Sequence, residues 1–422
     1  MTKPVLFIVF LIISFGIAAE ISQDISHIES KVIEWRRDFH QHPELSNREF
    51  RTAKIIAQHL KSLGMEVKTG VAHTGVTGFL KGDLPGPVIA LRADMDALPV
   101  TEQVDVPFAS KQTTTYRGET VGVMHACGHD THVAMLMGTA EVLSKNKATL
   151  KGSVLFIFQP AEEGAPEGEE GGAKMMLAEG IFKQYKPEVV FGAHITSSAP
   201  SGVLGYHSGP AMAAVDTFNL TVHGKQTHGS RPWGGVDPIV ASAQIINAVQ
   251  TIVSRKVDVT KAAAVVSFGA IKGGIRSNII PDKVEMVGTI RNFDMGIRDM
   301  IHENLRQIVE NTARASGATA ELVIHTGYPV TVNDPELTAQ MLPSLRKVFG
   351  DDRVIDMGMI TGAEDFSYYA QEVPGFFFFI GVTPHEINAK TAPTNHSPLF
   401  YVEESNLING VKAFVQLVND YE

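Results

Sequence analysis

Short apolar runs alternate with helical patterns along most of the chain. Helical stretches, such as residues 131–145, separate runs that are apolar on both faces, which is typical of strands buried on both sides of a sheet. These runs are GVTGFL (75–80), PVIALRA (87–93), SVLFIF (153–158), EVVFGAH (188–194) and FFFFIGV (376–382). A polar amphipathic helix from Ile21 to Glu44 and a second with Ile56, Leu60 and Leu63 on one face precede them. The alternation predicts an α/β fold with a mixed, mostly parallel sheet.

The middle of the chain has a different pattern. From Val215 onward, strands with alternating polarity and two helical stretches follow one another in the order β-α-β-β-α-β, which is typical of a compact ferredoxin-like unit. The expected elements are a strand at 215–224, a helix around 239–249, strands at 263–271 and 283–291, a helix at 295–316 and a strand at 320–324. We therefore expect an α+β lid or dimerisation domain at 211–326, inserted into a catalytic domain formed by 20–210 and 327–422.

The first 19 residues differ from the rest. One Lys precedes an uncharged apolar run from Val5 to Ile17, and small residues follow before Glu20. This is the pattern of a signal peptide, and the run is short for a membrane span. We expect a secreted or periplasmic protein with no stable membrane span once processed; the alternative is an uncleaved N-terminal anchor.

Composition narrows the class of protein. Of 422 residues, 44% are hydrophobic and 19% charged, which suits a soluble globular chain of two domains. The net charge of −10 disfavours nucleic acid as a partner, because nucleic acid binding relies on clustered Lys and Arg. Cys127 is the single cysteine, so no internal disulfide can form. Its role is that of a buried apolar side chain, a nucleophile or a metal ligand.

Several metal-binding side chains follow the carboxyl ends of predicted strands, where ligands of open α/β sheets gather. Thiolate, imidazole and carboxylate groups are the usual ligands of zinc and related divalent ions. The candidates are Cys127 and His129 before a helix, Glu162 and Glu163 after strand 153–158, His194 at the end of strand 188–193, and His396 after FFFFIGV. Neighbouring side chains of an extended loop point in opposite directions, so we expect one of Glu162 and Glu163 to bind a metal and the other to act as general base. The alternative is an acidic surface loop, because Glu167, Glu169 and Glu170 follow.

The chain resembles the metal-dependent amidohydrolases that include hippurate hydrolase, N-acyl-amino-acid deacylases and plant auxin-conjugate hydrolases. MHACGHD with a downstream QPAEE is highly specific to this branch. The matching stretches are 36–49, 91–100, 124–132, 158–164, 191–194, 207–216, 224–232, 277–282, 362–369 and 395–400, so the resemblance covers essentially everything after residue 19. It implies a zinc-exopeptidase-like catalytic domain.

The resemblance also implies two divalent ions per chain, with Glu162 as the general base that takes a proton from a water that they hold and acidify. The implied metal ligands are Cys127, His129, Glu163, His194 and His396. Sulfur ligation favours Zn²⁺, whereas the family often works with Mn²⁺; Co²⁺ and Ni²⁺ are alternatives. The rival interpretation of Cys127 is a nucleophile with His129 as its base. Related exopeptidases carry His-x-Asp where this chain has Asp94-Met95-Asp96, so Asp94 is a doubtful ligand and Asp96 is expected to orient one.

In the inserted domain, His228 matches a residue that stabilises the oxyanion in related enzymes. It is expected to act at its own site or at that of a partner in a homodimer or higher homo-oligomer; the alternative is a turn residue beside Gly229. Asn278 and Arg291 match positions that hold the product carboxylate.

The function expected from these features is hydrolysis of a small-molecule N-acyl-amino acid to a carboxylic acid and a free amino acid. One rival is a dipeptidase or carboxypeptidase on the same scaffold. Another is a non-catalytic metal- or ligand-binding protein.

Overall fold

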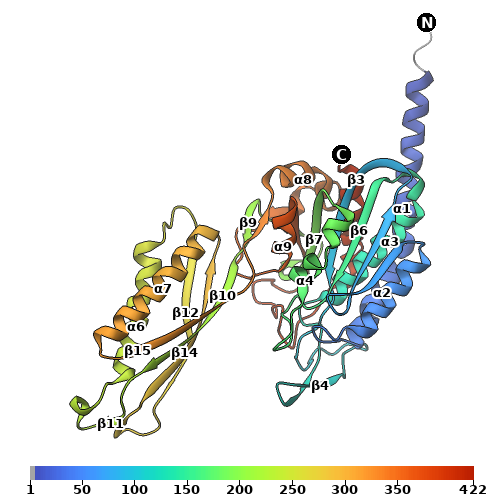
Figure 1. Ribbon diagram of the computed structural model, residues 1–422. Coiled ribbons are helices and arrows are strands. Elements are labelled where there is room, and N and C mark those ends of the chain that lie inside the picture. Colours follow the sequence, from blue (N-terminus) through green and yellow to red (C-terminus); the bar gives the residue numbers. More distant parts are fainter. Residues whose placement is uncertain (1–4) are drawn as a thin grey trace. The chain divides into compact units, whose positions relative to one another are not determined.

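The computed structural model describes residues 5–422 (Figure 1). It contains two compact units. Unit 1 comprises the chain up to Gly209, Asn333–Met357 and Tyr368–Glu422, and unit 2 comprises Pro210–Val332 and Gly358–Ser367. The predicted signal segment lies partly outside the described residues, and from Val5 onward it continues into helix α1 (Val5–Gln41). Where side chains are described, no helix has the length and apolar content needed to cross a membrane.

Unit 1 is built on an eight-stranded sheet with the order β1-β2-β6-β3-β7-β18-β8-β17. Four of its seven neighbouring pairs are parallel: β3 with β6, β3 with β7, β7 with β18, and β8 with β17. The predicted mixed, mostly parallel sheet is therefore confirmed. Its strands are β1 (Glu66–Val71), β2 (Gly75–Lys81), β3 (Leu84–Asp94), β6 (Lys151–Gln159), β7 (Val189–Pro200), β8 (Leu204–Tyr206), β17 (Val354–Asp356) and β18 (Gly375–Thr383).

The burial of these strands follows from their sequences. All nine residues of β18, GFFFFIGVT, are buried, as are the last six of β6. A strand with no polar face must be covered on both sides, which fixes the central place of β18 and β6 in the sheet. One expectation was wrong: β7 does not end at His194 but continues to Pro200, because β18 pairs with it as far as Thr383.

Helices cover the sheet of unit 1, and one of them carries part of the site. Helix α3 (His129–Lys145) is almost entirely buried and packs on α1, α2 (Phe50–Ser62) and α10 (Ile408–Asp420) (Figure 1). A Cβ at Gly138 of α3 would lie 2.9 Å from Val32 and 3.1 Å from Val411, so the absence of a side chain there allows the close approach of three helices. This packing holds the first residue of α3, His129, at the carboxyl ends of the parallel strands.

Unit 2 has the expected β-α-β-β-α-β order. Its sheet has the order β12-β14-β10-β15 and is antiparallel throughout. Helices α6 and α7 pack together and contact the sheet, and Phe218, Leu220 and Val222 of β10 are buried while their neighbours are not. The elements are β10 (Ala214–His223), α6 (Pro238–Thr251), β12 (Ala264–Gly273), β14 (Lys283–Asn292), α7 (Met295–Ala315) and β15 (Thr319–Thr326). This is the strand order of a ferredoxin-like fold.

The remaining elements are short or lie at the periphery. A hairpin pairs β4 with β5, and a second two-stranded sheet pairs β11 with β13. The bounds are β4 (Thr113–Tyr116), β5 (Glu119–Gly122), α4 (Gly172–Ala178), α5 (Ile181–Tyr185), β9 (Gly209–Met212), β11 (Thr227–His228), β13 (Ile279–Ile280), β16 (Thr331–Asn333), α8 (Pro335–Phe349) and α9 (Phe366–Glu372).

Candidate metal centre

The five predicted metal ligands come together in unit 1. Sγ of Cys127 lies 3.3 Å from Nε2 of His194 and 3.3 Å from Nε2 of His396. Nε2 of His396 lies 3.1 Å from Oε1 of Glu163, and Nε2 of His129 lies 3.9 Å from the same oxygen. These atoms come from the start of α3, the turn after β6, strand β7 and the loop after β18. The sequence therefore predicted which side chains meet, although they are up to 269 residues apart.

The donor atoms of this cluster fit a divalent cation. Nε2 of His129 is buried without a hydrogen-bond partner, which is unusual for a polar atom in a protein interior. The Nδ1 atom of His194 lies 2.6 Å from the carbonyl oxygen of Ile195 and donates to it, which leaves the Nε2 lone pair directed at the cluster. Sulfur, imidazole and carboxylate donors of this kind suit zinc and related ions.

The environment of Cys127 bears on the choice between ligand and nucleophile. Burial, together with the negative charges of Glu163 and Glu162, raises the pKa of the thiol well above its ordinary value. A nucleophilic cysteine needs the opposite, a pKa lowered by a nearby base or cation. The imidazole nitrogens at 3.3 Å from the sulfur belong to His194 and His396, not to His129. The site favours the metal-ligand interpretation, because a bound cation is what would ionise this thiol.

Asp94 and His132 form a second buried group beside the cluster. The sequence analysis did not predict this pairing. Nδ1 of His132 donates to Asp94 at 2.5 Å, and its Nε2 accepts the N–H of Ile195 at 2.8 Å, so both ring nitrogens are occupied. The other oxygen of Asp94 accepts from Arg92 at 2.7 Å. Although burial alone would raise it, the neighbouring imidazoles of His129 and His132 and the guanidinium of Arg92 hold the pKa of Asp94 well below its usual range. With these partners, Asp94 and His132 support the ligand shell rather than join it.

Asp96 holds His129, Glu162 and Glu163 in place through hydrogen bonds. Its carboxylate accepts from Nδ1 of His129 (3.2 Å), from the backbone N–H of Glu162 (3.1 Å) and of Glu163 (3.0 Å), and from the hydroxyl of Ser46 (2.7 Å). Burial opposes ionisation of Asp96, but these hydrogen bonds, His129 first, lower its pKa below the usual value. A bond at Nδ1 of His129 leaves Nε2 free to bind a cation.

The turn after β6 differs from the expected extended loop. Ala161 has a left-handed backbone with φ of 52°, which costs a non-glycine residue on the order of 1–3 kcal/mol. The next two N–H groups both point at Asp96. The chain is therefore curled, and the carboxylates of Glu162 and Glu163 do not point in opposite directions: they lie 4.0 Å and 3.9 Å from the same atom, Nε2 of His129.

The three residues predicted in the inserted domain all lie in unit 2. His228 is exposed in β11, and its Nδ1 accepts from Ser230; Asn278 accepts the N–H of Gly229 at 2.8 Å, so these two predicted residues are neighbours. Arg291 lies near the end of β14 that is remote from β13. It is eight residues beyond Lys283, the first residue of β14, which is about 26 Å along the strand. Unit 2 therefore brings His228 and Asn278 together but not Arg291. Their roles stay predictions.

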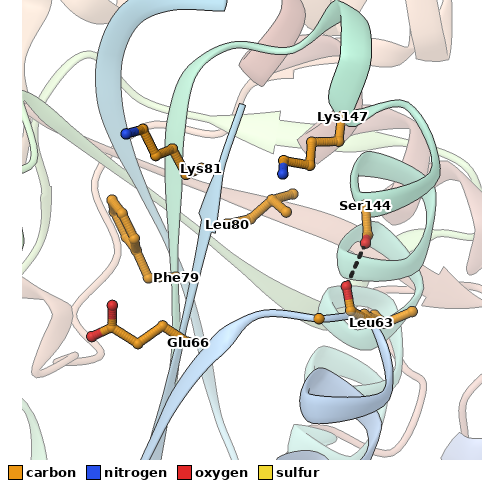
Figure 2. Close-up of a pocket in the computed structure, with 8 residues that line it drawn as sticks. Leu63, Glu66, Phe79, Leu80, Lys81, Ser144 and Lys147 are labelled. Atoms are coloured by element: carbon orange, nitrogen blue, oxygen red, sulfur yellow. Dashed lines mark hydrogen bonds between the residues drawn. The ribbon is translucent and has the colours of Figure 1, made fainter. Parts of the chain in front are cut away.

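One surface hollow of unit 1 lies apart from this chemistry (Figure 2). It contains none of the predicted site residues. Figure 2 shows Lys81 and Lys147 beside Leu80, and Ser144 donating to the carbonyl oxygen of Leu63 at 2.9 Å. Lys147 is paired with Asp83 at 3.4 Å, and none of the residues that line this hollow has a buried side-chain N or O atom without a hydrogen-bond partner, unlike Nε2 of His129.

Comparison with known proteins identifies the family. Residues 90–420 match the model of peptidase family M20/M25/M40. Thermostable carboxypeptidase 2 of Saccharolobus solfataricus is 44% identical over 400 residues, 94% of this chain and 97% of that protein. N-acetyl-L-cysteine deacetylase of Bacillus subtilis is 37% identical over 386 residues, 91% of this chain and 86% of that protein. The crystal structure of a dinuclear metal-binding M20 peptidase of Bacillus subtilis is 35% identical, with a TM-score of 0.76 and coverage of 93% and 98%. The chain belongs to peptidase family M20/M25/M40 and is a metal-dependent hydrolase.

Proposed function

We propose that this chain is a two-metal amidohydrolase that cleaves N-acyl-amino acids to a carboxylic acid and a free amino acid. The observation that carries the proposal is the cluster of thiol, imidazole and carboxylate groups at Cys127, Glu163 and His396, with a further carboxylate, Glu162, beside it. Glu162 Oε2 lies 4.0 Å from Nε2 of His129, within reach of a water bound among the ligands. The relative named N-acetyl-L-cysteine deacetylase supports an N-acyl-amino acid as the substrate.

The residues divide the work as follows. Cys127, His129, Glu163, His194 and His396 would hold the two ions, which when bound supply Lewis acidity and a water of lowered pKa. Glu162 takes a proton from the attacking water and returns it to the leaving amine. His228 donates a hydrogen bond to the oxyanion, at its own site or across a homodimer. Asn278 and Arg291 are the candidates to hold the carboxylate of the amino acid product, and because unit 2 keeps them apart, one chain brings only one of them to a given carboxylate. The inserted domain, 211–326, closes over the substrate.

A second candidate function is a carboxypeptidase or dipeptidase. It is favoured by the 44% identity to a protein named thermostable carboxypeptidase. Both reactions release a C-terminal amino acid from an amide bond, so they differ only in what lies on the acyl side: a small acyl group or a peptide. The same residues would serve either reaction.

We also propose that the protein acts outside the cytoplasm. The N-terminal pattern of one Lys, an apolar run and small residues supports this. N-terminal sequencing of protein exported from its host would test it: a mature N-terminus near Glu20 is expected, and retention of Met1 in exported protein would contradict cleavage.

The decisive experiment is a substrate panel on protein stripped by a chelator and reloaded with Zn²⁺, Mn²⁺, Co²⁺ or Ni²⁺. The panel contains N-acetyl-, N-benzoyl- and indoleacetyl-amino acids together with dipeptides and longer peptides. We expect reversible loss of hydrolysis on chelation, up to two ions per chain, and the highest kcat/KM for an N-acyl-amino acid. Preference for peptides would favour the second candidate, and full activity without metal, or none on any member with both ions bound, would contradict the proposal.

A further inference from the structure

The turn that carries Glu162 and Glu163 is held by one more carboxyl group, which comes from a residue 112 positions earlier in the chain. Oε1 of Glu49 accepts the N–H of Ala161 at 3.0 Å, and its Oε2 accepts the hydroxyl of Thr74 at 2.5 Å. Glu49 is fully buried and 112 residues away from Ala161 in the chain. Ala161 is the left-handed residue immediately before Glu162.

Helix formation does not explain this burial. Glu49 precedes α2, but its side chain makes no capping bond to the helix. The first N–H groups of α2 are instead capped by Glu44, which accepts from Arg51 at 2.9 Å and from Thr52 at 2.8 Å. Burial and the charge of Asp96 raise the pKa of Glu49 to about 8, so keeping this group inside is costly. Its carboxyl group is hydrogen-bonded to the hydroxyl of Thr74, the N–H of Ala161 and its own backbone N–H.

We propose that Glu49 is a positioning residue for Glu162. Its Oε1 fixes the N–H of Ala161, and the left-handed conformation of Ala161 directs the Glu162 side chain toward Nε2 of His129. Asp96 fixes the next two N–H groups, so three successive backbone donors are each held by a buried carboxyl group. Without Glu49 the first of these is released while Asp96 still holds the other two. The inference rests on the proposed role of Glu162 as general base.

The test compares Glu49→Leu, which removes the acceptor at similar volume, with Glu49→Gln, which keeps Oε1 and can donate to Thr74. Glu44→Leu is the matched control, because it removes the cap of the same helix and leaves Ala161 held. For each variant, kcat and KM are measured on the N-acyl-amino acid that the wild-type chain cleaves best, with Mn²⁺ content measured in parallel. We expect Glu49→Leu to lower kcat by about 10²-fold, the effect of displacing a catalytic group by about 1 Å. KM and Mn²⁺ content should stay at their wild-type values, and Glu49→Gln should restore kcat.

A double variant separates this inference from the function it rests on. If Glu49 acts through Glu162, adding Glu49→Leu to Glu162→Gln leaves the residual kcat unchanged, because the group being positioned is already gone. The inference is overturned if the two losses multiply, if Glu49→Leu behaves like Glu44→Leu, or if Glu49→Gln is as impaired as Glu49→Leu. A fully active Glu162→Gln would contradict the proposed function instead. Should Glu49→Leu not fold, Thr74→Val removes the second bond of Glu49; a smaller loss of kcat at constant Mn²⁺ content supports the inference, and wild-type kcat overturns it.

Discussion

Replacing Asp96 with Asn changes one atom and affects the whole ligand shell. The Asp96 carboxylate accepts four hydrogen bonds, at 2.7–3.2 Å, and the residue is only 1% exposed. In Asn, an NH₂ group takes the place of one oxygen and must face N–H or O–H donors. If the NH₂ group takes the Oδ1 position, the bonds from His129 and Glu162 are lost; if it takes the Oδ2 position, the bond from Glu163 is lost, while the Ser46 hydroxyl can turn and accept from the NH₂ group. At least one bond is lost either way, and water cannot replace it in this interior.

Two magnitudes follow from this geometry. Loss of the partner that orients a ligating histidine costs about 10–100-fold in metal affinity, or about 1.4–2.8 kcal/mol of binding free energy. Hydrogen bonds to an ionised group contribute about 1.5–3 kcal/mol each, so the loss of at least one should lower the free energy of unfolding of the metal-free protein by at least about 1.5 kcal/mol. Metal binding should be affected directly, because Asp96 contacts two predicted metal ligands, the ring of His129 and the backbone of Glu163.

Competition against a chromophoric chelator measures the affinity for Zn²⁺, and urea denaturation measures stability. Ser46→Ala is the matched control, since it removes one donor to the same carboxylate and leaves the bond to His129 intact. Asp96→Asn should bind Zn²⁺ about 10–100-fold more weakly than Ser46→Ala. Equal affinity in the two variants would refute the claim that Asp96 orients His129.

Three further predictions concern single side chains. Glu162→Gln should lower kcat by about 10²–10⁴-fold at near wild-type metal content, whereas Glu163→Gln should lose metal; the reverse pattern in metal analysis would exchange their roles. His228→Ala should lower kcat by about 10²–10³-fold without loss of metal, and mixing it with Glu162→Gln protein should restore some activity only if His228 acts across a dimer; an unchanged kcat would show that His228 is idle. Burial alone would raise the pKa of Asp216, but hydrogen bonds from His302 and Arg298 lower it to about 2, from 3.8. Its stabilising effect is therefore complete above pH 3.8 and lost as the pH falls toward 2, so Asp216→Asn should flatten the acid side of the stability curve in urea denaturation; an unaltered curve would contradict this.

The sequence predicted the elements and the ligand types because both leave local patterns. Apolar runs such as FFFFIGV require burial on both faces, and the ends of parallel strands share one edge of the sheet, which places Glu163 near Cys127. The end of β7 was misplaced because its last residues pair with β18, a tertiary contact with no local pattern.

The parts of the site that the sequence did not reveal are long-range hydrogen bonds. Nothing near Glu49 in the chain indicates that it holds Ala161, and nothing near His132 indicates that both of its nitrogens are occupied. The curl at Ala161 is likewise set by acceptors from elsewhere, which explains why an extended loop was the wrong expectation for Glu162 and Glu163.

The first and last strands of the unit 2 sheet, β10 and β15, lie side by side, so the chain enters and leaves this sheet at neighbouring points. Asp216 of β10 lies opposite Thr326 of β15, and Val215 exchanges backbone hydrogen bonds with Gly327 (3.1 Å) and Tyr328 (3.0 Å). An inserted segment whose ends are adjacent affects the folding of the surrounding domain in the way that a long loop does. The entropic cost of closing a loop rises only slowly with loop length. Residues 214–326 therefore have the form of a cassette: a short turn could join Ala213 to Gly327, and the cassette could be exchanged between relatives without changing the strand order of the larger sheet.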